Sequence, residues 1–278
     1  MKTANGQLGF LSHSNTSASQ DEKLRVLAVA AHPDDIEFMM AGTFLLLGDA
    51  GAQLHYLTLS NGDLGSTRYD REKTAFIRRY EAKQAAALAS AQFHESFCTD
   101  LNIDYDQKTI AKLSAVVRQV DPTIVLIPSL SDYMEDHMQT ARVALTAVFA
   151  KGIPSYQSDP PQPSVSRPVA LYHALPHGLL DGLKQRVVPD FCVDISSVIE
   201  RKVSMLKCHE SQGEWLDATQ NISSYVQGLY DFATEIGSLY GNCRFAEGWI
   251  RHNPLGYSPK DFDPLRTILQ PFIRGVSR

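Results

Sequence analysis

Long hydrophobic runs are absent from this sequence, and so is an excess of positive charge. No stretch approaches the ~18 consecutive apolar residues of a membrane-spanning helix, so we expect no membrane span. Lysine and arginine number 26 against 31 aspartate and glutamate residues, which gives a net charge of −5. Proteins that bind nucleic acid usually carry a basic stripe, so this balance argues against a nucleic-acid partner. The 278 residues are 44% apolar and can bury a substantial core.

Cysteine is scarce as well. No cysteine belongs to a C-x-x-C pair, which argues against a thiolate zinc cluster; the four are Cys98, Cys192, Cys208 and Cys243. A chain poor in disulfides suits a reducing compartment, so we expect a cytoplasmic protein. Residues 1–22 are polar and lack the apolar run of a secretory signal. We expect them to form a flexible N-terminal arm before a single domain over residues 23–278.

Short β-branched runs alternate with longer segments of helical periodicity. The runs that predict buried strands are residues 24–30, 54–59, 123–127, 169–173 and 191–195. The segments that predict helices are residues 36–50, 70–91, 108–120, 137–151, 196–211 and roughly 222–240. Strands that alternate with helices imply right-handed crossovers. The sequence therefore predicts an α/β fold, with a mainly parallel sheet that helices cover on both faces.

Residues 153–168 contain five prolines and interrupt this alternation. Proline has no N–H to donate, so the segment cannot be a central strand and is expected to be a loop. It is interpreted either as a surface connection or as a rim over a binding pocket, since long loops in compact domains are often functional.

The most informative segment is His32-Pro33-Asp34-Asp35, which follows the first predicted strand and precedes a helix. In an open parallel sheet, ligands bind beyond the carboxyl ends of the strands. Three ionisable groups there are costly to bury unless a cation compensates them. A catalytic zinc ion usually takes three protein ligands, and His137 follows the carboxyl end of the strand over residues 123–127. We expect His32 and His137 to face each other across one crevice.

Several further motifs accompany this segment, and together they resemble the LmbE-like de-N-acetylases, the family of PIG-L. The resemblance spans roughly residues 24–212 and rests on Ala31–Glu37 (A-H-P-D-D-x-E), Ala41-Gly42-Thr43, Leu57–Asp63, Arg78–Ala85 (R-x-x-E-x-x-x-A), Asp136-His137, Asp194-Ile195-Ser196, Lys202 and His209–Gln212 (H-x-S-Q). It implies a Rossmann-like fold, in agreement with the predicted alternation of strands and helices.

The resemblance also implies residue roles. His32, Asp35 and His137 are expected to bind Zn²⁺, or another divalent metal such as Fe²⁺, and Asp34 is expected to be the general base. Arg78 falls where the family places a substrate-contacting arginine, although it could instead form an ion pair with Glu81 on its own helix.

One family residue is missing. Relatives often carry a histidine where this chain has Met134, and that histidine is thought to stabilise the tetrahedral intermediate. His209 is our preferred replacement, with His173 and His177 as alternatives, and a purely structural histidine remains open for each.

Other candidate substrate-binding residues come from two segments. Asn61 and Asp63 belong to the motif that follows the second predicted strand. Trp249 lies in a segment that mixes aromatic and charged residues, where it could stack on a sugar or simply pack at the periphery.

These residues predict hydrolysis of a linear amide bond. Zinc would polarise the carbonyl and activate a water molecule, and Asp34 would take the proton. The predicted substrate is a small N-acetylated sugar, such as an N-acetylglucosamine glycoside or glycoconjugate, and a homo-oligomer is compatible with the sequence. Two alternatives stay open: an iron(II) oxygenase, since two histidines and a carboxylate also form its metal site, and a non-catalytic sugar-binding protein.

Overall fold

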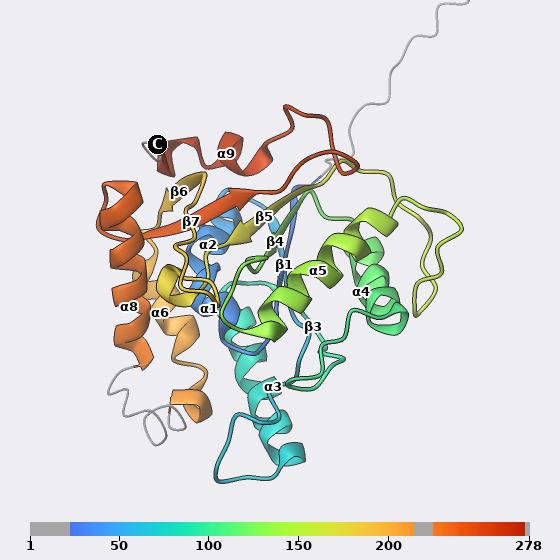
Figure 1. The fold of residues 1–278 in the computed structure, drawn as a ribbon, viewed down its shortest axis with the longest axis horizontal. Coiled ribbons are helices and arrows are strands. Elements are labelled where there is room, and N and C mark those ends of the chain that lie inside the picture. Colours follow the sequence, from blue (N-terminus) through green and yellow to red (C-terminus); the bar gives the residue numbers. More distant parts are fainter. Residues whose placement is uncertain (1–22, 214–224, 276–278) are drawn as a thin grey trace, which may run out of the picture.

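Eight strands form one sheet in the computed structural model, which describes residues 23–213 and 225–275 (Figure 1). Their order is β3-β2-β1-β4-β5-β7-β6-β8. The first five strands in this order are parallel, and the pairs β5–β7, β7–β6 and β6–β8 are antiparallel. The strands are β1 (Arg25–Ala30), β2 (Gln53–Thr58), β3 (Gln92–His94), β4 (Ile124–Ile127), β5 (Ala170–Ala174), β6 (Phe191–Asp194), β7 (Ala246–Arg251) and β8 (Ile273–Gly275).

Helices cover both faces of the sheet. Helices α4 and α5 pack on one face, and α1, α2, α3, α6 and α8 pack on the other (Figure 1). The helices are α1 (Asp35–Met39), α2 (Ala41–Asp49), α3 (Arg71–Leu88), α4 (Gln107–Val120), α5 (Glu135–Ala150), α6 (Ile199–Leu206), α8 (Tyr225–Ile236) and α9 (Pro264–Ile268), with short turns η1 (His177–Leu179), η2 (Gly237–Gly241) and η3 (Gln270–Phe272). Within the described ranges, no helix combines the length and the apolarity that a membrane crossing requires.

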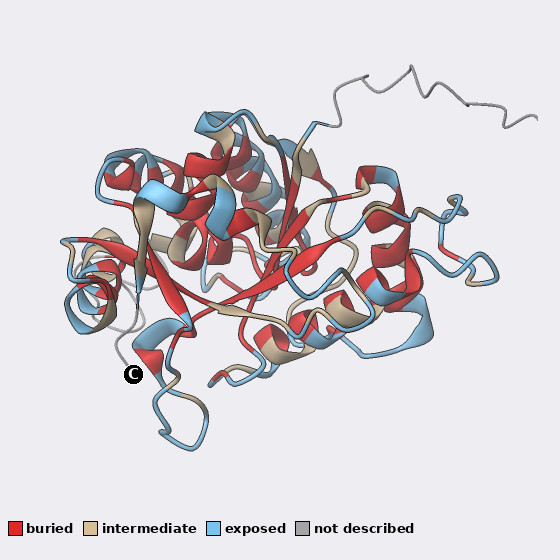
Figure 2. Cartoon of the chain, turned by 90° about the horizontal axis from the view of Figure 1, so that it is seen from above, coloured by how far each residue is buried: buried red, intermediate tan, exposed pale blue. Residues whose placement is uncertain are grey.

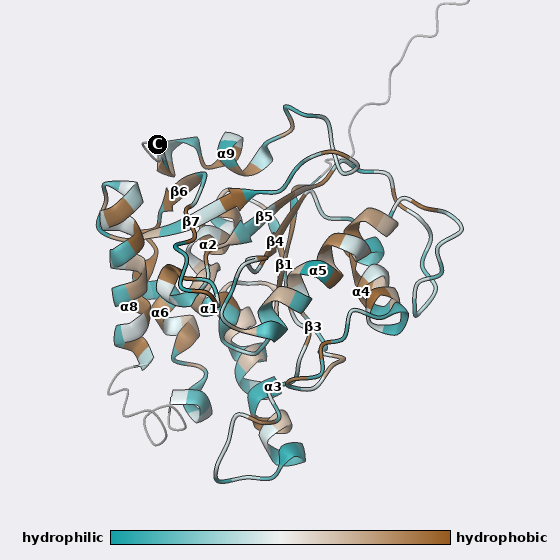
Figure 3. Cartoon of the chain, in the orientation of Figure 1, coloured by the Kyte–Doolittle hydropathy of each residue, from teal (hydrophilic) through white to brown (hydrophobic). Residues whose placement is uncertain are grey.

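The central strand β1 shows why the sheet is covered twice. Val26, Ala28 and Ala30 belong to the hydrophobic cluster on the α2 face, and Leu27 and Val29 belong to the cluster on the α5 face. Successive side chains of a strand point to opposite faces, so an all-apolar strand needs cover on both. The strands are accordingly buried in Figure 2 and hydrophobic in Figure 3. Polar groups on this sheet are thus expected at the strand ends.

The predicted fold class is confirmed, and each of the five predicted strands is present to within a residue or two. Three strands were missed. Strand β3 has three residues and β8 has three, which is too short for a clear periodic signal. Strand β7 was interpreted as peripheral or pocket-lining, but it lies between β5 and β6 inside the sheet. The helix predicted over residues 196–211 ends at Leu206.

The proline-rich loop is a surface connection. The buried guanidinium of Arg118 holds it by donating to the backbone carbonyls of Tyr156, Gln162 and Ile153 at 2.8–3.1 Å. The loop follows the carboxyl end of α5, whereas His137 lies at the amino end of that helix. None of residues 153–168 lines the cavity described below, so the alternative interpretation as a pocket rim is not supported. The predicted arm over residues 1–22 lies outside the described residues, as do residues 222–224 of the helix predicted near 222–240.

Candidate metal centre

Two neighbouring strands deliver the candidate ligands to one place. Strand β1 pairs directly with β4, and the chain leaves β1 through His32 and leaves β4 towards α5, which carries His137. Asp34 adopts φ = 100°, a left-handed conformation that turns the chain sharply into α1. As a result, one ligand atom from each of His32, Asp35 and His137 lies within 4.8 Å of the other two.

The spacing of these atoms fits a tetrahedral metal ion. Nδ1 of His32 lies 3.4 Å from Oδ2 of Asp35, and Nε2 of His137 lies 3.3 Å from Oδ1 of the same carboxylate. Donors held about 2.1 Å from a zinc ion at tetrahedral angles lie roughly 3.4 Å apart. Two imidazoles and one carboxylate also form a common ligand set for catalytic zinc.

Each imidazole is oriented by a second carboxylate. Nε2 of His32 lies 2.9 Å from Oδ2 of Asp136, and Nδ1 of His137 lies 3.0 Å from Oδ2 of Asp132. An imidazole that donates to a carboxylate through one nitrogen presents the lone pair of the other to a metal. These contacts therefore leave Nδ1 of His32 and Nε2 of His137 as the metal-facing atoms.

The electrostatic balance of this group favours a cation. Burial disfavours the charged form of His32, but the hydrogen bonds to Asp136 and Asp35 outweigh it and raise its pKa to about 9. Burial also opposes charge on His137, and Asp35 and Asp132 still raise its pKa well above the usual value. His32 and His137 thus retain their protons because the surrounding carboxylates outnumber the two imidazoles. A divalent cation would compensate the same negative charge and displace these protons.

Asp34 contacts other partners than Asp35 does. Its Oδ2 accepts a hydrogen bond from the Tyr225 hydroxyl and lies 3.7 Å from Nη2 of Arg78. Burial raises the pKa of Asp34, Arg78 lowers it and Asp35 raises it, and the net shift is upward. A carboxylate with a raised pKa beside a metal site, but not among its ligands, suits a general base.

Comparison with known proteins agrees with this geometry. Residues 27–148 match the family described as PIG-L: GlcNAc-PI de-N-acetylase. This match covers the three candidate ligands, His32, Asp35 and His137. A diacetylchitobiose deacetylase of Thermococcus kodakarensis is 28% identical over 237 residues, 83% of each chain. A 4-oxalmesaconate hydratase of Pseudomonas putida is 29% identical over 194 residues, 67% of this chain and 73% of the relative.

Solved structures show the same fold. The N,N'-diacetylchitobiose deacetylase of Pyrococcus horikoshii superposes with a TM-score of 0.67 and 22% identity, covering 88% of this chain and 89% of that one. Curated relatives and solved structures thus both include deacetylases, and both also include a hydratase.

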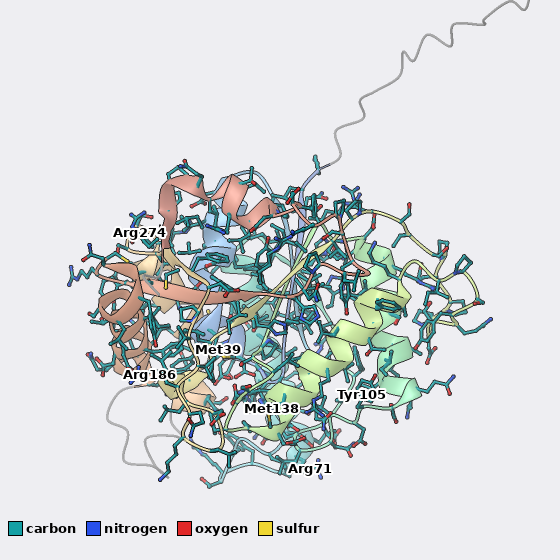
Figure 4. The ribbon with its side chains drawn as sticks, turned by 45° about the horizontal axis from the view of Figure 1, so that its top comes forward. Met39, Arg71, Tyr105, Met138, Arg186 and Arg274 are labelled. Atoms are coloured by element: carbon teal, nitrogen blue, oxygen red, sulfur yellow. The ribbon has the colours of Figure 1, made fainter. Side chains whose placement is uncertain are left out.

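A cavity of about 510 Å³ opens onto the candidate metal centre. Most of its wall is apolar, and the side chains include Phe38, Met39, Leu64, Leu101, Tyr133 and Met134. In the view of Figure 4, the cavity-lining Met39 lies near the centre, whereas Arg71, Arg186 and Arg274, which do not line the cavity, lie towards the edges. The polar residues Arg78, Asp100 and Gln212 also line the cavity. Nε of Arg78 and Oε1 of Gln212 are buried and have no hydrogen-bond partner among the described residues.

Arg78 lines the cavity, and the motif around Gly62 makes room for its side chain. Nη1 of Arg78 lies 3.4 Å from the carbonyl of Gly62, and Nη2 donates to the carbonyl of Pro33 at 2.6 Å. Gly62 has φ = 74°, and a Cβ there would lie 2.7 Å from Cδ of Arg78. Glycine at this position therefore permits both the turn and the close approach of the guanidinium.

Asn61 and Asp63 do not line the cavity, in contrast to the prediction that they contact substrate. Oδ1 of Asn61 accepts from the backbone of Asp63, and Asp63 accepts from the side chain of Arg71 and from the backbone of Asp100. Their short side chains are used within the loop, which they hold in the shape that places Asp100 at the cavity.

Trp249 is also outside the cavity. It is fully buried in β7, and its Nε1 donates to Oγ1 of Thr43 at 2.9 Å. The predicted sugar-stacking face is therefore covered by the protein core, because β7 is an interior strand rather than a peripheral segment.

Three histidines were considered as replacements for the imidazole missing at position 134. His209 has a side chain with no exposed surface, 3.4 Å from Glu37, so in this arrangement it cannot touch a bound substrate. His173 contacts the carbonyl of Pro128 and His252. Only His177, on η1, lines the cavity. The preference for His209 came from its sequence motif, and the motif does not reveal whether the side chain faces the cavity.

Three further residues of the site were not predicted from the sequence: Asp132, Asp136 and Tyr225. Asp136 was visible as the neighbour of His137, and its role follows from the general tendency of metal-binding histidines to donate to a carboxylate. Asp132 could have been proposed in the same way. Tyr225 lies 191 residues from Asp34, and no local pattern connects the two.

Proposed function

We propose that this protein is a metal-dependent hydrolase that removes an N-acetyl group from an amino-sugar substrate. The carrying observation is that one cavity contains three clustered ligands and a further carboxylate, Asp34, that is not needed as a ligand. The deacetylases among the relatives support the same reaction class.

Each residue of the site has a proposed role. His32, Asp35 and His137 would hold Zn²⁺, and Fe²⁺ suits the same donors. When bound, the cation supplies a Lewis acid for the acyl carbonyl and lowers the pKa of a water molecule. Asp34 takes the proton of the attacking water and later delivers it to the leaving amine.

The substrate-binding groups lie in the polar part of the cavity wall. Arg78 and Gln212 line this part of the wall together with Asp100. Their side chains carry hydrogen-bond donors and acceptors that suit sugar hydroxyls, because each hydroxyl can donate and accept. These polar groups support a sugar rather than an apolar amide as the substrate.

We assign the stabilisation of the oxyanion to His177. Position 134 carries a methionine, which has no N–H to donate, and His177 is the remaining cavity-lining imidazole once the two metal-binding histidines are set aside, within the described residues. Preorganised donors of this kind lower the barrier by stabilising charge that develops in the transition state.

Hydration of an unsaturated carboxylic acid is a second candidate. The observation in its favour is Met134 together with the hydratase relative, because adding water to a carbon–carbon double bond passes through no tetrahedral oxyanion at an amide. The metal and Asp34 would still be required to prepare the water.

The test is release of free amine by the zinc-loaded protein, assayed without oxygen against N-acetylglucosamine, N,N'-diacetylchitobiose and other N-acetylated amino sugars. Amine release that disappears in Asp34→Asn supports the proposal and excludes an oxygen-dependent iron enzyme. A parallel assay follows loss of ultraviolet absorbance from unsaturated dicarboxylates. Hydration without amine release would favour the second candidate. Sugar binding without either reaction would instead indicate a non-catalytic sugar-binding protein.

A further inference from the structure

Helix α8 contributes a tyrosine to the catalytic end of the cavity. Tyr225, at the beginning of the described part of α8, is 8% exposed and lines the cavity together with His32, Asp34 and His137. Its hydroxyl donates a hydrogen bond to Oδ2 of Asp34. Tyr225 lies outside residues 27–148, the part of the chain that matches the PIG-L family.

The two oxygens of Asp34 have different surroundings. Oδ2 receives the Tyr225 hydroxyl and lies 3.7 Å from the guanidinium of Arg78. No described residue donates a hydrogen bond to Oδ1, and this atom is not among the buried polar atoms that lack a partner. One oxygen is thus held by the protein, and the other remains available to a water molecule or substrate in the cavity.

The backbone at Asp34 makes this support necessary. A left-handed conformation is unfavourable for a residue with a side chain, and it persists only where surrounding contacts enforce it. The Asp34 side chain accepts no hydrogen bond from the backbone amides at the start of α1. Its orientation therefore depends on its tertiary partners.

We infer that Tyr225 is a positioning residue, which holds Oδ2 of Asp34 so that Oδ1 faces the reacting water. This inference rests on the proposed role of Asp34 as the base. Burial and the charge of Asp34 raise the pKa of the Tyr225 phenol well above its usual value, so the phenol keeps its proton and serves as a donor at neutral pH. It takes no proton from the substrate and forms no bond to it.

A purely structural role for Tyr225 makes a different prediction. The ring packs edge-on against Phe38 with centroids 5.1 Å apart, which could by itself fix α8 against α1. Tyr225→Phe keeps the ring and removes only the hydroxyl. Tyr230→Phe is the matched control, because it removes the same atom from the same helix, where the hydroxyl donates to Glu200 at 2.9 Å and not to the cavity.

The experiment compares kcat, KM, metal content and melting temperature for the full-length wild type, Tyr225→Phe, Tyr230→Phe, Asp34→Asn and the double variant Asp34→Asn/Tyr225→Phe. We expect Tyr225→Phe to lower kcat about tenfold or more, as loss of a hydrogen bond to a charged group would, with KM and metal content unchanged. Tyr230→Phe should retain wild-type kcat. Because Tyr225 acts through Asp34, the double variant should be no slower than Asp34→Asn alone.

Wild-type kcat in a fully metallated Tyr225→Phe would overturn the inference, and so would an equal further loss on the Asp34→Asn background. Crystal structures of the wild type and of Tyr225→Phe give a readout that does not depend on turnover. A displaced Asp34 carboxylate supports the inference even if no amino sugar is hydrolysed, which would refute the proposed function alone. An Asp34 carboxylate in the same place in both structures refutes the positioning role.

Discussion

Asp34 and Asp35 are adjacent in sequence, yet the fold gives them opposite environments. Asp35 contacts the two imidazoles, which together with its hydrogen bonds outweigh burial and hold its pKa well below the usual range. Asp34 contacts Tyr225 and Arg78, and burial raises its pKa. Carboxylates whose pKa values are pushed apart commonly divide the roles of ligand or stabiliser and of proton carrier. The chain turns sharply between the two environments, because Asp34 has a left-handed backbone conformation.

The first prediction concerns the base. Asp34→Asn preserves the size of the side chain but removes its capacity to take a proton, so we expect a ~10²–10⁴-fold lower kcat. Metal content, measured on the same preparation by atomic absorption, should equal that of the wild type. Full metal loading with near-wild-type turnover would remove Asp34 from the base role.

The second prediction separates His177 from His209. His177→Ala should lower kcat and kcat/KM together, by about 10²-fold, because it removes a donor used mainly in the transition state. His209→Ala should lower the melting temperature and leave kcat per folded molecule unchanged, because Glu37 then loses a buried charged neighbour.

A rescue experiment completes this comparison. Met134→His places an imidazole at a cavity-lining position where the family resemblance predicts a histidine, so it should restore part of the activity of His177→Ala. The reverse pattern, with loss of turnover in His209→Ala and none in His177→Ala, would return the role to His209.

The clustering of His32, Asp35 and His137 could be predicted from sequence because these residues follow two buried strands, and parallel strands bring their carboxyl ends to one edge. The choice of Asp35 rather than Asp34 as a ligand came from the family resemblance. His177 lies in a turn after β5 and Tyr225 is the first described residue of α8, and no local pattern marks either as a cavity position. Their positions depend on packing against Phe38, with ring centroids 5.1 Å and 5.6 Å away, and not on local periodicity.

At the scale of elements, strand β7 owes its place to a buried ion pair. Oε1 of Glu247 accepts from Nζ of Lys202 at 2.6 Å, and both side chains are 1% exposed. The two carboxylate oxygens also accept from the backbone amides of Gly42 and Thr43 at 2.7 Å, at the amino end of α2. A carboxylate is favourable there because the helix dipole is positive at that end. Glu247 therefore connects β7, α6 and α2. A charged residue in the middle of a strand breaks the apolar pattern that predicts buried strands, so β7 was missed.

The third prediction follows from this ion pair. Lys202→Met removes the cation and leaves a buried carboxylate, and breaking such a pair typically costs about 3–5 kcal/mol of folding free energy. Urea denaturation should show this loss, and metal content per folded molecule should stay unchanged. The double variant Lys202→Met/Glu247→Gln should recover part of the stability, since no buried charge is left alone. Arg201→Met is a suitable control, because Arg201 pairs with Asp49 at the exposed surface, where ion pairs contribute little.

At the scale of the whole molecule, the cavity is assembled from both halves of the chain. The cavity-lining residues from the first half are 32, 34, 35, 38, 39, 64, 65, 78, 100, 101, 133, 134 and 137, and those from the second are His177, Gln212, Tyr225 and Gly228. The first group supplies the metal centre and lies within the PIG-L match. The second group closes the cavity around it. We therefore expect the reaction class to depend mainly on the first half and the choice of substrate on the second.

The last prediction tests the metal centre through global stability, because a ligand that binds only the folded state stabilises it. With free zinc at 100 times the dissociation constant, the gain is about 2.7 kcal/mol, which corresponds to a rise in melting temperature of roughly 5–10 °C for a domain of this size. Treatment with a chelator should remove this rise, and added zinc should restore it.

Asp34→Asn and Asp35→Asn are a matched pair of variants, since each replaces one carboxylate oxygen by an amide nitrogen at neighbouring positions. The rise should persist in Asp34→Asn, because Asp34 contacts Tyr225 and Arg78 rather than the ligand imidazoles. It should be lost or strongly reduced in Asp35→Asn, because Asp35 lies 3.3–3.4 Å from both. An equal rise in both variants would show that zinc binds elsewhere, and the assignment of His32, Asp35 and His137 as ligands would then be wrong.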